Sequence, residues 1–168
     1  MARKLRELIL VRHAKSDWRD DTEDFDRPLS TKGKKNAAKI GKWLHENGLT
    51  PDHILVSPSK RTLQTFKRFC TECSIPYRLV HELYLADVDT LKDILKTAPS
   101  VQRLMIVGHN PGLEELNRFL QNKLEFEESD LFPTGSVAHY ILPEDWSHLE
   151  AGDGVLQNFI RPKDLKGR

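Results

Sequence analysis

Two histidines of the 168-residue chain each follow directly on a run of aliphatic residues. Residues 8–11 (Leu-Ile-Leu-Val) lead into Arg12 and His13, and residues 104–108 (Leu-Met-Ile-Val-Gly) lead into His109. Runs that are apolar at every position are typical of central parallel strands, which are buried on both faces. Open α/β sheets bind their ligands at the carboxyl ends of such strands. Arg12 and His13 could instead begin a solvated loop, but the second strand-end histidine favours one shared site.

A second arginine and a carboxylate follow two further predicted strands, residues 54–56 and 77–80. Pro58 is typical of a helix start, so Arg61 is expected in the first helical turn, where unpaired backbone N–H groups favour an anion. Glu82 follows the other strand, and a carboxylate there could serve as a proton donor. Each of the two side chains could equally be a solvated surface group if considered alone.

Parallel β-α-β order brings the carboxyl ends of successive strands to one rim of the sheet. We therefore expect the side chains of Arg12, His13, Arg61, Glu82 and His109 to converge on one crevice. Two guanidinium groups match the geometry of phosphate oxygens, and a neutral imidazole with one nitrogen held as a donor is a nucleophile. The carboxyl group can protonate a leaving atom. This set suits phosphoryl transfer through a phosphohistidine.

Strands and helices alternate along the chain. A 3.6-residue apolar period predicts helices that begin at an N-cap near Thr31, after Pro58, near Leu91 and near Leu113. Residues 136–142 and 155–160 are predicted to be strands, and because their connection has no helical period they are expected to form a hairpin at the sheet edge. The pattern predicts a three-layer α/β/α sandwich with a mostly parallel central sheet of about six strands and one antiparallel edge.

Length and charge limit the class of protein. The 168 residues, of which 38% are hydrophobic, fit a single domain over residues 1–168 without a separate lid domain. The 26 basic residues nearly cancel the 25 acidic ones, which argues against a nucleic-acid partner. No stretch has the length of a transmembrane helix or the pattern of a signal peptide. We therefore expect a cytoplasmic monomer that binds neither nucleic acid nor membrane.

The two cysteines and an acidic run are the remaining candidates for a metal site. Cys70 and Cys73 lie in a predicted helix, and because a tetrahedral zinc needs four ligands we interpret them as buried reduced thiols. The acidic residues between Asp20 and Asp26 are interpreted as a solvated loop, because nothing nearby supplies fixed geometry for a cation.

Four motifs of the chain resemble those of the histidine phosphatase superfamily, which is phosphoglycerate-mutase-like. Within it the resemblance is to the small SixA-like phosphohistidine phosphatases. Val-Arg-His-Ala at residues 11–14 is similar to the Arg-His-Gly signature, with Ala14 in the glycine position, and residues 57–65 are similar to the second signature. Glu82 in Glu-Leu-Tyr and His109 in Gly-His-Asn-Pro match the other two. The motifs cover nearly the whole chain in the family's order.

The resemblance implies that His13 accepts the phosphoryl group and that Arg12, Arg61 and His109 hold it. It implies that Glu82 is the general acid and base. No metal or other cofactor is expected, since cationic side chains take the role that Mg²⁺ plays in other phosphoryl-transfer sites. Four further residues could lie at the rim of the site, Lys15, Ser16, Asn110 and Thr134, with Lys15 and Asn110 as substrate ligands, although each could equally be a surface residue.

Phosphohistidine on a protein is the substrate expected first, and three alternatives stay open. A phosphate-binding module without turnover would lack the nucleophile or the acid, whereas both are present. A mutase or a small-molecule phosphatase would need a cover, and the short stretch between Arg61 and Glu82 leaves little room for one. A metal-dependent hydrolase is disfavoured, because the histidine spacing matches no compact ligand set.

Overall fold

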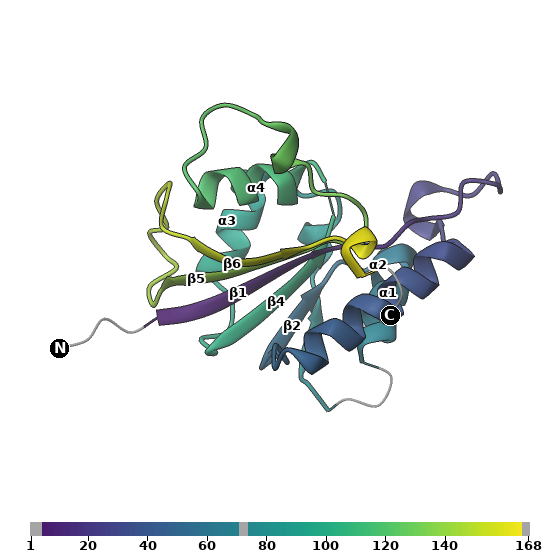
Figure 1. The fold of residues 1–168 in the computed structure, drawn as a ribbon, viewed down its shortest axis with the longest axis horizontal. Coiled ribbons are helices and arrows are strands. Elements are labelled where there is room, and N and C mark those ends of the chain that lie inside the picture. Colours follow the sequence, from purple (N-terminus) through teal and green to yellow (C-terminus); the bar gives the residue numbers. More distant parts are fainter. Residues whose placement is uncertain (1–4, 71–73, 166–168) are drawn as a thin grey trace.

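The central feature of the computed structural model, which describes residues 5–70 and 74–165, is a six-stranded sheet (Figure 1). Its strands lie in the order β3-β2-β4-β1-β5-β6. They are β1 (Leu5–Arg12), β2 (His53–Val56), β3 (Tyr77–Leu79), β4 (Arg103–Gly108), β5 (Val137–Pro143) and β6 (Val155–Ile160). The first four strands run parallel, and β5 and β6 form an antiparallel hairpin at one edge. The predicted sheet is confirmed.

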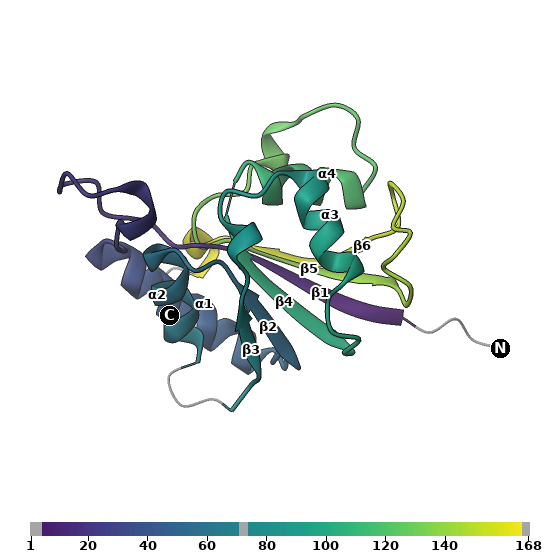
Figure 2. The ribbon, with the colours of Figure 1, turned by 180° about the vertical axis from the view of Figure 1, so that it is seen from behind.

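Helices cover both faces of the sheet, which makes three layers (Figures 1 and 2). Helices α1 (Thr31–Glu46) and α2 (Lys60–Phe69) pack on one face, and α3 (Val88–Lys96) and α4 (Gly112–Leu120) on the other. In β1, Leu8 and Leu10 face α3 and α4, whereas Ile9 and Val11 face α1 and α2. All four side chains are fully buried, and each contributes about 1.5–3 kcal/mol by leaving water. This burial fixes the strand end that carries Arg12.

Serine side chains cap the N-termini of α1 and α2, the two helices beside the site. Ser30 accepts a hydrogen bond from the Gly33 amide at the start of α1, so the N-cap is Ser30 and not Thr31 as predicted. Ser59 accepts from the Thr62 amide at the start of α2, which places Arg61 in the first turn as expected.

The cysteine interpretation is not upheld. Cys70 is the C-cap of α2 and is disulfide-bonded, which contradicts the expected reduced thiol. Cys73 lies outside the described residues. No helix in the described ranges is long and apolar enough to cross a membrane.

Candidate active site

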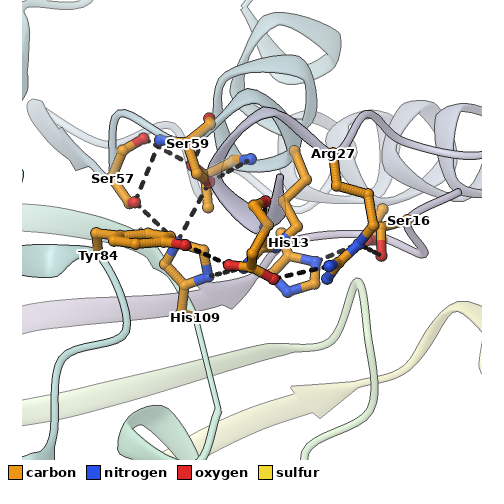
Figure 3. Close-up of polar contacts among 11 residues, drawn as sticks. His13, Ser16, Arg27, Ser57, Ser59, Tyr84 and His109 are labelled. Atoms are coloured by element: carbon orange, nitrogen blue, oxygen red, sulfur yellow. Dashed lines mark hydrogen bonds and ion pairs between the residues drawn. The ribbon is translucent and has the colours of Figure 1, made fainter. Parts of the chain in front are cut away.

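Neighbouring strand ends bring the two predicted histidines together. β1 and β4 are adjacent, with Arg12 opposite Gly108, and the His13 amide donates a hydrogen bond to the Gly108 carbonyl at 3.1 Å. The imidazole rings of His13 and His109 are consequently 5.3 Å apart between centroids (Figure 3). The strand-end argument from the sequence is therefore correct for both residues.

The His13 imidazole is held with one nitrogen free. Its Nδ1 lies 2.8 Å from the Ala14 carbonyl oxygen. Because a carbonyl only accepts, Nδ1 carries the proton and Nε2 keeps its lone pair. Burial, together with the charges of Arg61 and Arg12, lowers the pKa of His13 to about 3 against the opposing hydrogen bond to Ala14. His13 is thus neutral at pH 7, as a nucleophile must be.

His109 has the opposite tautomer. Its Nε2 lies 2.8 Å from the Ser57 hydroxyl, and its Nδ1 lies 3.4 Å from Nη2 of Arg61, which can only donate (Figure 3). Burial and then the proximity of His13 and Arg61 lower the pKa of His109 to about 3. A bound dianion would raise the pKa of His109 and favour a proton on Nδ1, which could then donate to the anion.

The two predicted arginines keep unpaired donors. Arg12 donates through Nη1 to the Phe132 carbonyl at 3.0 Å, and Arg61 is 2% exposed. The Nε atoms of both are buried and have no hydrogen-bond partner in the part of the chain that the structure describes. A buried donor left unpaired costs about 1–3 kcal/mol. An oxyanion with several acceptor oxygens would remove that cost, which favours a phosphate group here.

Glu82 does not lie in this site. It is exposed on a 3₁₀ turn, η2 (His81–Leu83), and it lines a separate cavity with Arg78 and Thr90. The physical reason is its neighbour, since Leu83 is 1% exposed and is anchored in the core between the sheet and α3. The turn that buries Leu83 directs Glu82 outward, so the predicted proton donor is not placed over His13.

A different carboxylate is present, on the loop predicted to be merely solvated. Asp24, in the 3₁₀ turn η1 (Asp24–Asp26), accepts from Nη2 of Arg61 at 3.1 Å and from the Tyr84 hydroxyl. Its backbone carbonyl accepts from Nη1 of Arg61 at 2.6 Å. Packing of the Phe25 ring on Tyr84, at 5.1 Å between centroids, holds the turn there.

The charge state of Asp24 follows from these contacts. Burial acts to raise its pKa, but hydrogen bonds from Tyr84, Arg61 and Arg27 outweigh burial and lower the pKa to about 2. Burial and the Asp24 carboxylate raise the pKa of Tyr84. Asp24 is therefore a carboxylate at pH 7, and it is hydrogen-bonded to Arg61, one of the two arginines expected to bind phosphate.

The cavity around His13 has a volume of about 590 Å³, and the other predicted rim residues line it. They are Lys15, Ser16, Asn110 and Thr134. Asn110 has a structural task, because its amide donates to the Phe132 carbonyl at 2.9 Å, the same oxygen that Arg12 contacts. Ser16 accepts from Nε of Arg27 at 2.9 Å. Ser16 thus holds Arg27, Asn110 holds the carbonyl group that Arg12 contacts, and Lys15 is exposed.

Close packing fixes the segment after His13. A Cβ atom at Gly33 would lie 2.0 Å from the Lys15 carbonyl oxygen, so α1 approaches this segment as closely as only glycine allows. Ala14 is fully buried beside Leu29 and Ala37, and its amide donates to the Thr65 hydroxyl at 3.0 Å. Positive φ angles among described non-glycine residues occur elsewhere, so the methyl group of Ala14 introduces no backbone strain.

Comparison with known proteins decides the family. The sequence model of the histidine phosphatase superfamily (branch 1) matches residues 8–111, a range that includes every strand end described above except that of β5 and β6. The chain belongs to this superfamily.

Similar proteins indicate to which branch of the superfamily this histidine phosphatase belongs. A structure of the protein histidine phosphatase SixA complexed with tungstate superimposes with a TM-score of 0.79 at 25% identity, covering 95% of this chain and 99% of that one. A protein from Nakamurella multipartitia, provisionally named phosphohistidine phosphatase SixA, gives 0.82 at 26% identity over 95% and 97%. An uncharacterized Mycobacterium tuberculosis protein is 31% identical over 160 residues, which are 91% of this chain and 100% of that protein. This chain is therefore a phosphatase of the SixA-like branch.

Proposed function

We propose that this histidine phosphatase removes the phosphoryl group from phosphohistidine on proteins, through a phosphoenzyme intermediate on His13. The observation that carries the proposal is the free lone pair on Nε2 of a neutral His13, beside two buried arginines with unpaired Nε donors. The complex of the SixA relative with tungstate, a tetrahedral oxyanion like phosphate, supports an anion site of this kind.

In the first step, Nε2 of His13 attacks phosphorus in line and the bond from phosphorus to the leaving nitrogen breaks. The leaving imidazole takes a proton from the Asp24 carboxyl group or from water, and Arg12 and Arg61 stabilise the charge on the phosphoryl oxygens. The phosphoryl group displaces Asp24 from Arg61, which removes one of the hydrogen bonds that lower the carboxyl pKa and places a dianion nearby. The pKa of Asp24 then rises, so that Asp24 can hold and deliver a proton.

In the second step, a water molecule attacks the phosphoryl group on His13. The Asp24 carboxylate accepts the water proton while the bond from phosphorus to Nε2 of His13 breaks, and inorganic phosphate leaves. The Tyr84 hydroxyl, which contacts Asp24, keeps the carboxylate oriented toward the site. We propose that no metal takes part, because the two arginines and a protonated His109 supply the positive charge.

The choice of substrate rests on leaving-group chemistry. A phosphoramidate nitrogen departs easily once protonated and can take its proton from water, whereas an alkyl ester needs a positioned general acid and binding energy from remote contacts. The low pKa of Asp24 keeps its half-buried carboxyl group mostly ionised near pH 7, so the site suits the phosphoramidate better. A small-molecule phosphatase is the second candidate. A single domain without a lid, a monomeric state and a cytoplasmic location stay predictions.

A substrate panel tests the proposal. We expect kcat/KM for a phosphohistidine protein or peptide to exceed that for phosphoserine peptides and sugar phosphates by at least about tenfold, roughly 1.4 kcal/mol. Addition of EDTA should leave all rates unchanged. If a sugar phosphate were hydrolysed fastest and with a low KM, the protein would be a small-molecule phosphatase instead. A loss of activity in EDTA that Mg²⁺ restores would refute the metal-free scheme.

Substitution of Asp24 and substitution of Glu82 are expected to have different effects on activity. We expect Asp24→Asn to lower kcat on an aryl or alkyl phosphate ester by about 100-fold, because it removes a proton donor, and to lower kcat on a phosphoramidate less. Glu82→Gln should leave both rates within about twofold, since its side chain lines another cavity. Steady-state kinetics on both substrates measure this difference. An equal loss of kcat in the two variants would indicate that Glu82 also takes part as a general acid.

A further inference from the structure

Segment 17–28 forms one wall of the active-site cavity and is closed at its base. Ser16 pairs with Leu29 in an isolated antiparallel bridge, and the Asp17 amide donates to the Pro28 carbonyl at 2.8 Å. The segment extends from the carboxyl edge of the sheet, as the purple loop beside α1 in Figures 1 and 2. Its base is therefore fixed relative to His13, and its side chains can present a defined surface.

Trp18 is the most unusual side chain of this segment. It is 73% exposed, although it lines the cavity that contains His13. One face of the indole ring packs on the Arg27 guanidinium, whose carbon lies 3.5 Å from the ring centroid. Arg27 is itself fixed by hydrogen bonds to Ser16 at 2.9 Å and to Asp24 at 2.7 Å (Figure 3). The indole is thus pre-positioned with its other face available, which is typical of a residue that anchors a partner.

The charges that line the cavity are unbalanced. Among the residues that the structure describes, the cavity is lined by one carboxylate, that of Asp24, and by five cationic side chains: Arg12, Lys15, Arg27, Lys32 and Arg61. Asp24 pairs with Arg27 and Arg61. Lys15 and Lys32 are exposed and form no ion pair with any described residue. Since the whole chain carries a net charge of only +1, this positive rim is a local feature.

A phosphoryl group on His13 would use the two arginines, but it would leave the lysines and the indole without a partner. We propose that Trp18, Lys15 and Lys32 form a docking surface for acidic residues that flank the phosphorylated side chain of a protein substrate. The aliphatic part of that flanking segment packs on the indole, and its carboxylates pair with the two lysines. This proposal rests on the proposed function, and it names the part of the substrate that decides affinity.

The test compares two phosphohistidine peptides and one small phosphoramidate. One peptide carries Asp and Glu beside the phosphohistidine, and the other carries Asn and Gln at the same positions. We expect kcat/KM of the wild type to be at least about tenfold higher for the acidic peptide, because its KM is lower. The Trp18→Ala/Lys32→Glu variant should lose that preference. Both positions are exposed, and a glutamate in the first turn of α1 interacts favourably with the helix dipole, so the variant should fold.

Two controls separate this surface from general effects. Lys67→Glu changes the same charge on an exposed position of α2 that does not line the cavity, and it should keep the preference for the acidic peptide. Equal kcat/KM for the two peptides in the wild type, with the small phosphoramidate still hydrolysed, would overturn the docking surface and leave the proposed function standing. A wild type that hydrolyses no phosphoramidate at all would refute both.

Discussion

Replacement of His13 by alanine is expected to reduce kcat on a phosphoramidate by at least about 10³-fold. The variant keeps both arginines and therefore the anion site, but it has no atom that can form the phosphoenzyme. The buried imidazole of His13 is neutral and its Nδ1 donates to the Ala14 carbonyl, so Nε2 carries the free lone pair, and alanine removes that atom. Phosphate release measured under saturating substrate gives the result directly.

A matched variant controls for the loss of a histidine as such. His148→Ala removes an exposed imidazole far along the chain, and it should leave kcat unchanged. If His13→Ala kept more than a tenth of the wild-type rate while remaining folded by circular dichroism, covalent catalysis at His13 would be excluded.

The second large effect is expected from Arg61→Lys. Lysine keeps the charge but loses the planar fork and the buried Nε donor, and its compact ammonium cannot replace both. We expect kcat/KM to fall by about 100-fold, or about 2.7 kcal/mol of transition-state stabilisation. Inhibition by vanadate, which adopts the trigonal-bipyramidal shape of the transition state, should weaken in the same variant.

The control for Arg61 is on the same helix. Arg68→Lys makes the same change at an exposed position in the last turn of α2, and it should leave kcat/KM and vanadate inhibition unaltered. Similar kinetics for Arg61→Lys and the wild type would mean that the guanidinium does not contact the phosphoryl group.

The positions of His13, Arg61 and His109 were predictable because burial determines them. Aliphatic runs such as residues 8–11 are typical of central strands, and in a parallel sheet the side chains that follow them lie at one rim. The hairpin of β5 and β6 was predictable for a related reason, since the connection between the strands lacks a helical period. These inferences depend on long apolar patterns and tolerate small errors in element boundaries.

Glu82 and Asp24 were not predictable in the same way. The orientation of a short 3₁₀ turn determines which of its side chains faces the site. In η2 the side chain of Leu83 is buried, and Glu82 therefore points away from His13. Asp24 reaches the site through contacts between residues far apart in sequence, such as Phe25 with Tyr84. The available signal was that this acidic loop leaves the sheet rim after His13 and returns to it at Pro28.

The most direct test of the central claim is to trap the phosphoenzyme. The wild type is mixed with a ³²P-labelled phosphoramidate, stopped within milliseconds in alkaline detergent, and the protein is separated and digested. We expect a label that is stable in base, labile in acid, located on His13 and absent from His13→Ala. A wild type that turns over substrate without any trapped label, or an equal label in His13→Ala, would contradict this expectation.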